Sequence, residues 1–296
     1  MRIVSLLPSA TEIVYLLGLE DSLVGVTHEC DWPSGARQKP RVSYSNIPAQ
    51  ATQAEIDRLV SESVTGGAPT HGLDHGAISA LAPDLVITQD LCQVCAVPAG
   101  HLRAALDVLG IDAQVISLDP SSLAEVLAGV TAVARATGTE ERAAEILGEL
   151  EGRLDRVKAS VAGFDRPRTF ALEWGDPPYN AGHWVPEMIE LAGGEPLLAR
   201  AGMASVRISW REIARSEAEV VVFMPCGYDL EGAKKEAVAL LDRAEIAGAR
   251  AIYAAGANGY FSRPGPRLVE GVEALAAVLH EDSLLSAPPG VIARMR

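Results

Sequence analysis

The sequence predicts an α/β protein made of two lobes, each with a parallel sheet, joined by a long helical segment. Three observations support this prediction. Short apolar runs alternate with helical stretches along the whole chain, the two halves repeat the same order of elements, and the segment between them is helical and charged. A length of 296 residues also fits two domains of roughly 100–200 residues each.

Seven short apolar runs are expected to be strands. Unbroken β-branched runs such as 220–222 are typical of parallel strands that are buried on both faces. Helices are expected between the strands, for example over 53–63, where Thr52 and Glu55 form a capping-box pattern, and over 101–109. The expected strands cover residues 2–7, 23–27, 85–89, 114–118, 169–174, 220–224 and 251–254.

The two halves of the chain resemble each other in their order of elements. The strand 2–7, a helix and Gly18 correspond to the strand 169–174, a helix and Gly193. The sequence therefore predicts two Rossmann-like lobes joined by a rigid helical linker, with a ligand cleft between the lobes. The predicted domains are an N-terminal lobe over 1–121, a linking helical segment over 122–163 with a break near Gly138, and a C-terminal lobe over 164–296.

The composition excludes several classes of partner. The chain has 25 basic and 39 acidic side chains and a net charge of −14, which disfavours nucleic acids and anionic membrane surfaces. No apolar run reaches the roughly 18–20 residues that span a bilayer, so membrane insertion is not expected. Hydrophobic residues make up 48% of the chain, enough for a large core.

The first residues bear on the compartment. Arg2 and the apolar residues after it are similar to a signal peptide, but Pro8 and Ser9 interrupt the apolar run. Ser9 and Glu12 form a capping-box pattern that predicts a helix start. We therefore expect a cytoplasmic protein with reduced thiols, or a periplasmic or envelope protein if the start is wrongly assigned.

Three segments carry a resemblance to a known family: IVSLLPSATE at 3–12, PDLVI at 83–87 and WGDPPYNAG at 174–182. They resemble class III periplasmic binding proteins, the helical-backbone metal receptors, and are most similar to the cobalamin-binding proteins of ABC importers. The resemblance implies a binding protein, not an enzyme, that holds cobalamin or a related large metal-containing cofactor between its lobes. Siderophore and heme binders share the architecture.

The resemblance also implies site residues. Pro8, Tyr179 and Tyr260 match positions that line the ligand cleft of the family. Where the importer proteins have a cleft tyrosine after the second strand, this chain has HECDWP at 28–33, which makes Glu29 and Trp32 candidates. The remaining candidate from the first lobe is Tyr44, which falls near the position of a family tryptophan.

Two departures from the family concern transport. Gly76 and Ser262 stand where the family has acidic positions that dock to a transporter, so docking to an ABC transporter is in doubt. About 30 residues around 65–75 have no counterpart in the importer proteins.

His71 and His75 lie in this region four residues apart, but Gly72 between them disfavours a helical two-histidine metal face and favours a polar loop.

Aromatic residues are only 5% of the chain, yet many follow predicted strands. This placement favours a flat aromatic cleft for a large planar ligand, although the same residues could pack the bases of loops. Arg263 could bind an anionic group of the ligand or cap its loop. The aromatic candidates, besides those of the first lobe, are Trp174, Tyr179, Trp184, Tyr260 and Phe261.

The four cysteines support an alternative function. Cys30, Cys92, Cys95 and Cys226 each follow a predicted strand, so they could join His28 in a zinc site or hold an iron–sulfur cluster. Such a metal protein could be an enzyme, with Glu29 transferring protons. Unligated thiols are the competing interpretation. An ordinary ABC-importer binding protein for siderophore, heme or cobalamin is the third alternative.

Overall fold

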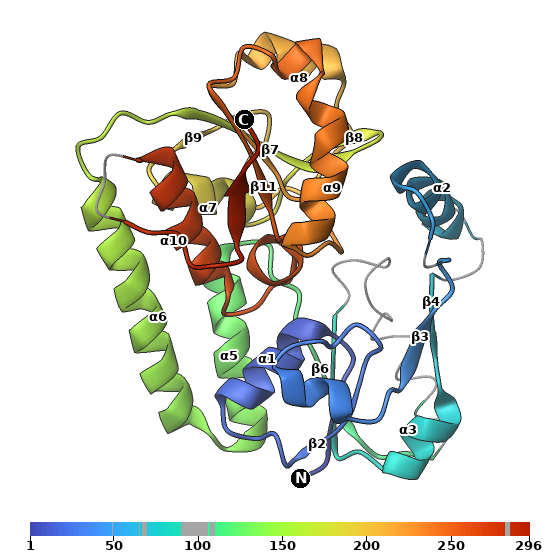
Figure 1. The fold of residues 1–296 in the computed structure, drawn as a ribbon. Coiled ribbons are helices and arrows are strands. Elements are labelled where there is room, and N and C mark those ends of the chain that lie inside the picture. The colour runs from blue at the N-terminus through green and yellow to red at the C-terminus, as the bar shows by residue number, and fades with distance from the viewer. Residues whose placement is uncertain (49, 65, 67–69, 90–105, 107–109, 282–284) are drawn as a thin grey trace. The chain divides into compact units, whose positions relative to one another are not determined.

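The computed structural model describes the chain except residues 49, 65, 67–69, 90–105, 107–109 and 282–284 (Figure 1). The chain divides into an N-terminal unit and a C-terminal unit. The predicted linking segment 122–163 is split between these two units. The N-terminal unit consists of residues 1–120 and 127–147, and the C-terminal unit consists of residues 121–126 and 148–296.

The N-terminal unit is built on a four-stranded parallel sheet in the order β2-β1-β5-β6. The side chains of β1 and β5 are buried on both faces, as unbroken apolar runs predict. Each strand lies within a range that the sequence predicts. The strands are β1 (Ile3–Ser5), β2 (Leu23–Val26), β5 (Leu85–Thr88) and β6 (Gln114–Ser117).

Helix α1 (Pro8–Leu16) follows β1 directly, and its start corrects one prediction. The expected capping box of Ser9 and Glu12 is wrong, because the helix begins at Pro8 and has no side-chain cap. Proline fits the first helical position because its fixed φ is helical and its missing N–H would have no partner there. Ser9 therefore lies inside the first turn, where it is buried and its hydroxyl oxygen has no hydrogen-bond partner.

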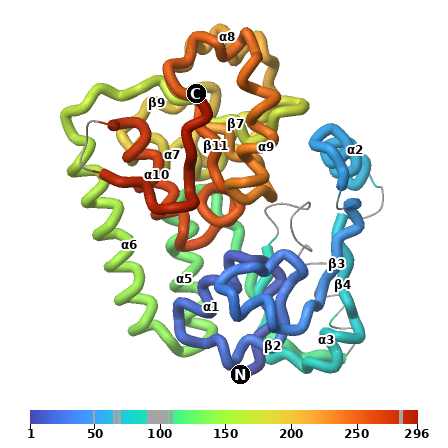
Figure 2. The backbone as a smooth tube through the Cα atoms, in the orientation of Figure 1, coloured from blue at the N-terminus to red at the C-terminus, as the bar shows by residue number. Residues whose placement is uncertain are grey.

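An antiparallel ribbon of two strands, β3 (Ser43–Ser45) and β4 (His71–Leu73), extends the N-terminal unit (Figure 2). The prediction of a polar loop at His71 is wrong, because this residue lies in β4. Helix α2 (Gln53–Val64) separates the two strands in sequence and begins with the predicted capping box: Thr52 N donates to Glu55 Oε2, and Glu55 N donates to Thr52 Oγ1. Helix α3 (His75–Leu81) follows β4. The predicted helix 101–109 lies almost entirely outside the described residues.

The C-terminal unit has a sheet in the order β12-β11-β10-β7-β8, with β9 paired to β7. Strands β7, β10 and β11 are parallel and coincide with predicted strands, whereas β8 and β12 are antiparallel additions that the sequence does not predict. The strands are β7 (Arg168–Gly175), β8 (Pro178–Asn180), β9 (Glu195–Pro196), β10 (Val220–Phe223), β11 (Ala251–Ala255) and β12 (Ile292–Arg294).

The segment between the two sheets is helical with the predicted break. Gly138, at a positive φ of 69°, separates α5 from α6. The guanidinium of Arg153 makes two hydrogen bonds to the Glu273 carboxylate, of 2.8 and 2.7 Å, which fasten the second half of α6 to α10. The other helices are α5 (Leu123–Thr137), α6 (Glu140–Val161), α7 (Val185–Leu191), α8 (Trp210–Ser216), α9 (Leu230–Leu241) and α10 (Leu268–Leu279), with short helical turns η1 (Ser34–Gln38), η2 (Ala244–Ile246) and η3 (Asn258–Ser262).

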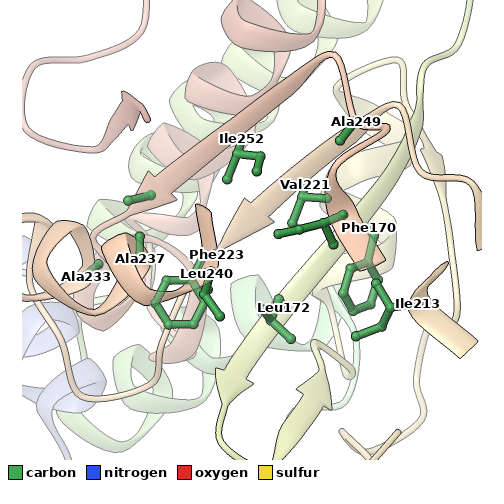
Figure 3. Packing of buried hydrophobic residues seen from close by; sticks show 12 residues of the cluster. Phe170, Leu172, Ile213, Val221, Phe223, Ala233, Ala237, Leu240, Ala249 and Ile252 are labelled. Carbon is green, nitrogen blue, oxygen red and sulfur yellow. The ribbon is translucent and has the colours of Figure 1, made fainter. Parts of the chain in front are cut away.

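One face of the C-terminal sheet packs against α8 and α9. Figure 3 shows side chains of β7, β10 and β11 meeting Ile213 of α8 and the small residues of α9. The small side chains of Ala233 and Ala237 let α9 approach the sheet closely, and Leu240, near the end of α9, packs in the same cluster. This layer holds the three parallel strands in place, and with them the segments that leave their carboxyl ends.

The packing around Phe223 gives a stability prediction. Its side chain is 1% exposed, so Phe223→Ala should leave a cavity and lower the free energy of unfolding by about 3–5 kcal/mol. Urea denaturation followed by circular dichroism measures the change. Val238 of α9 is 58% exposed, and Val238→Ala should shift the same quantity by less than about 0.5 kcal/mol. Equal effects of the two changes would contradict this core.

Candidate functional site

The predicted site residues follow the carboxyl ends of parallel strands in both units. In sheets of this kind, ligands bind where the loops leave these ends. In the N-terminal unit, Pro8 follows β1 and residues 28–32 follow β2. In the C-terminal unit, Cys226 and Tyr228 follow β10, and Tyr260 follows β11. Each edge is described by itself below.

Cys30 lies inside a buried network of hydroxyl groups in the N-terminal unit. Its sulfur is 3.1 Å from Thr11 Oγ1 and 3.4 Å from Thr27 Oγ1. The Thr11 hydroxyl donates to Ser5 Oγ, and Ser5 in turn donates to the Leu7 carbonyl. Either the thiol or the Thr11 hydroxyl can be the donor in the contact between them, and the Cys30 side chain is fully buried in this network.

His28 is held by the ribbon strand β3. Both its backbone N–H and its ring Nδ1 lie on the Ser43 hydroxyl oxygen, at 3.2 and 2.7 Å. Its ring lies 5.1 Å from that of His71, centroid to centroid, with a tilt of 48°. Burial lowers the pKa of His28, the Glu29 carboxylate opposes this shift, and the charges of His71 and Arg41 add to it.

The other N-terminal candidates differ in exposure. Pro8 is buried at the start of α1, and Glu29 is exposed beside His28. Trp32 and Tyr44 are 50% and 52% exposed, which is unusual for aromatic residues. The ring of Tyr44 lies across Gly72, where a Cβ atom would come within 2.3 Å of it.

Four partly exposed aromatic residues gather at the carboxyl edge of the C-terminal sheet. Trp174 is the next-to-last residue of β7 and meets Tyr228 edge-on, with ring centroids 6.1 Å apart. Tyr179 of β8 is the register partner of Trp174, and the guanidinium of Arg207 lies 5.7 Å from its ring. We call Trp174, Tyr179, Tyr228 and Tyr260 the aromatic edge.

The fourth residue of the aromatic edge, Tyr260, lies in η3, which follows β11. The guanidinium of Arg267 lies 5.1 Å from the ring of Tyr260, a cation–π contact. Arg263 directly follows η3 and is half-buried, as is Cys226 after β10. Positive charge therefore accompanies the aromatic rings at two places on this edge.

Two predicted ligand residues lie inside the C-terminal unit. Trp184 and Phe261 are buried, and the indole N–H of Trp184 donates to the Phe261 carbonyl at 2.7 Å. Their arrangement links the start of α7 to η3, so in the structure they support the loop that carries Tyr260. Sequence reasoning places them near a strand end but cannot tell an inward ring from an outward one.

A polar network that the sequence does not predict fixes the residues next to Trp174 and Tyr179 in the chain. The Ser205 hydroxyl donates to the Glu173 carboxylate and accepts the Gly182 N–H at 3.0 Å. Asn180 accepts the Val206 N–H at 2.7 Å. A Cβ atom at Gly182 would come within 2.4 Å of a backbone oxygen, so this position requires glycine. The WGDPPYNAG segment contains the signal for part of this network.

The hypothesis of a four-cysteine metal site stays a prediction. Cys92 and Cys95 lie outside the described residues, and Cys30 and Cys226 belong to different units. Within the part of the chain that the structure describes, no three His, Cys, Asp or Glu residues come together to hold a metal ion.

Comparisons with known proteins identify the family. A family model described as periplasmic binding protein matches residues 3–256. An uncharacterized ABC transporter substrate-binding lipoprotein of Bacillus subtilis is 25% identical over 291 residues, which cover 95% of this chain and 81% of that protein. A vitamin B12-binding protein of Yersinia pestis is 24% identical over 220 residues, 73% of this chain and 65% of its own length. The match thus spans just under two thirds of that relative.

Solved structures show the same two-lobed α/β fold. The periplasmic vitamin B12 binding protein of Vibrio cholerae superposes with a TM-score of 0.68 at 22% identity, covering 95% of this chain and 96% of that chain. A periplasmic heme binding protein from Pseudomonas aeruginosa gives 0.73 at 21% identity, with 99% and 97% covered. The two solved relatives are named periplasmic and the Bacillus subtilis relative is named a lipoprotein, so the expectation of a cytoplasmic protein is not supported. No helix among the described residues is both long and apolar enough to cross a membrane.

The burial of His28 predicts how it titrates. In the folded chain its pKa lies below the value of 6.5 for an unperturbed histidine. The unfolded state therefore binds more protons as the pH falls through about 6.5, and folding stability should be highest above that pH and decline below it. An imidazole NMR titration should place the His28 midpoint below 6.5, and Glu29→Gln should lower it further by removing a negative charge. A midpoint at or above 6.5 would contradict the buried environment.

Proposed function

This chain belongs to the periplasmic binding protein family, and we propose that its ligand is cobalamin or a related corrinoid. The chain is a substrate-binding protein of the ABC-importer type, and its relatives are solute-binding proteins, not enzymes. The proposal concerns the finer point of which ligand it holds. The vitamin B12-binding proteins among its relatives support a corrinoid.

The aromatic edge is the observation that carries the proposal. A corrinoid is a large, nearly flat macrocycle with apolar faces and an amide-rich rim. Partly exposed aromatic rings offer such a ligand a large contact area with little loss of side-chain entropy. Trp174 and Tyr228 already fix each other edge-on, and Tyr179 is set by its strand register with Trp174, so the surface is rigid before the ligand arrives.

Heme is a second candidate because of the arginines on this edge. Arg207 lies beside Tyr179, and Arg267 lies beside Tyr260. A planar ligand with carboxylate groups could stack on the rings and pair with the guanidinium groups. The chain as a whole is acidic, with a net charge of −14, and would repel an anionic ligand. The two guanidinium groups next to the aromatic rings offset this repulsion at the edge itself.

Direct titration tests the ligand. The purified protein should bind cyanocobalamin with micromolar or tighter affinity in calorimetry and change its visible spectrum. Hemin and a ferric siderophore, titrated in parallel, decide between the candidates. Absence of corrinoid binding at tens of micromolar would overturn the corrinoid proposal, and tighter binding of hemin would replace it with the second candidate.

Substitution of Trp174 tests the aromatic edge. Trp174→Ala should weaken corrinoid binding by roughly tenfold or more, because it removes a stacking surface and loosens Tyr228. Phe164, three residues after the end of α6, is 41% exposed, and Phe164→Ala serves as a matched loss of an exposed aromatic residue. It should leave the affinity unchanged. Equal affinities of the Trp174→Ala variant and the unaltered protein would remove this edge from the binding site.

A further inference from the structure

We propose that His28 and His71 form a binding site for a divalent metal ion of the kind that prefers imidazole, such as Zn²⁺ or Ni²⁺. The site lies wholly within the N-terminal unit, between the segment after β2 and the ribbon strand β4. It does not depend on the proposed corrinoid ligand. It shares His28 with the zinc site considered above but uses none of the four cysteines.

The two rings contain buried nitrogens without partners. In the described part of the chain, three buried side-chain nitrogen or oxygen atoms lack a hydrogen-bond partner: Ser9 Oγ, His28 Nε2 and His71 Nδ1. Two of the three thus belong to this one pair of histidines. Buried polar atoms are nearly always paired in folded proteins, and each exception calls for an explanation. A metal ion, which binds the lone pair of a neutral imidazole nitrogen, is such an explanation.

The spacing of the rings fits a shared ion. The ring centroids of His28 and His71 lie 5.1 Å apart with a tilt of 48°. Two imidazoles that each bind one ion at about 2.1 Å, at roughly the tetrahedral angle, have centroids about 5 Å apart. A stacked pair would instead have nearly parallel rings. The observed separation of the ring centroids is thus the one expected of two imidazoles that share an ion.

Ser43 prepares His28 for this role. Its hydroxyl oxygen accepts the His28 backbone N–H at 3.2 Å and lies 2.7 Å from ring Nδ1. If Nδ1 carries the proton and donates to Ser43, then Nε2 keeps a free lone pair. The opposite tautomer would bury an Nε2–H group with no acceptor, which is costly. Metal-binding histidines commonly donate their second ring N–H to an oxygen in this way.

The ribbon places the second ligand on the same side as Ser43. In the β3–β4 pairing, Ser45 lies opposite His71 and Ser43 opposite Leu73, so the side chains of Ser43 and His71 share one face. Tyr44 and Gly72 form the pair on the other face. The ribbon therefore supplies both the second imidazole and the group that orients the first.

The charges around the pair suit a cation. The Glu29 carboxylate lies close enough to raise the pKa of His28 against the effect of burial. Arg41 is also near, but its guanidinium donates to the Thr27 and Cys30 carbonyls and is directed at the backbone. With two protein ligands among the described residues, water would complete the coordination. We therefore expect a single exchangeable ion instead of a permanent structural one.

Metal titration of the full chain, stripped with a chelator and kept reduced, tests the site. Calorimetry with Ni²⁺ or Zn²⁺ alone should show one principal site. His28→Ala and His71→Ala should each weaken it at least tenfold. Ser43→Ala, a positioning change, should weaken it less and leave the stoichiometry at one. Circular dichroism confirms that each variant is folded, and Ni²⁺ should broaden the His28 and His71 imidazole signals of the unaltered protein.

Two controls make the outcome decisive. His75, exposed at the start of α3 only four residues from His71, should be replaceable by Ala without loss of the site. The double change Cys92→Ser and Cys95→Ser should also retain it. Metal binding that survives the two histidine changes, or that disappears with the cysteines, would overturn the proposal. Because the probe is the metal ion alone, failure here and failure of corrinoid binding are separate results.

Discussion

The packing of parallel strands that are buried on both faces is the constraint on which the rest of this structure depends. Such strands cannot be joined by tight turns, so a helix must carry the chain back each time. The parallel strands of each sheet then end at the same edge of that sheet. In the C-terminal unit, β10 is hydrogen-bonded in register to β7 and β11, and this alignment brings Trp174, Tyr228 and Tyr260 to one edge although they are distant in sequence.

The central strands could be predicted because burial on both faces leaves an unbroken apolar run. The strands that the sequence did not indicate, β3, β4, β8, β9 and β12, are two or three residues long and lie in ribbons or toward sheet edges. Their conformation comes from a neighbouring backbone and not from their own side chains. The start of α1 failed for a local reason, since Pro8 and Ser9 both offered a helix start and proline took the first position.

The site residues divide along the same line. Strand-end placement indicated Trp174 and Tyr179, which are partly exposed, but it did not distinguish them from Trp184 and Phe261, which are buried. Whether a ring faces solvent depends on what packs behind it, which no local pattern encodes. The arrangement of His28 with Ser43 and His71 could not be foreseen because it needs the β3–β4 pairing, and that pairing joins segments separated by α2.

The buried thiol of Cys30 has a consequence for experiments on folding. With 0% exposure, it is not accessible to an alkylating reagent while the N-terminal unit is folded. Labelling at this position therefore requires opening of the region around α1 and β2, and its rate reports how often that happens. Cys226, half-buried in the C-terminal unit, is an internal reference in the same molecule. The labelling rate of Cys30 thus measures local unfolding of the N-terminal unit without any added probe.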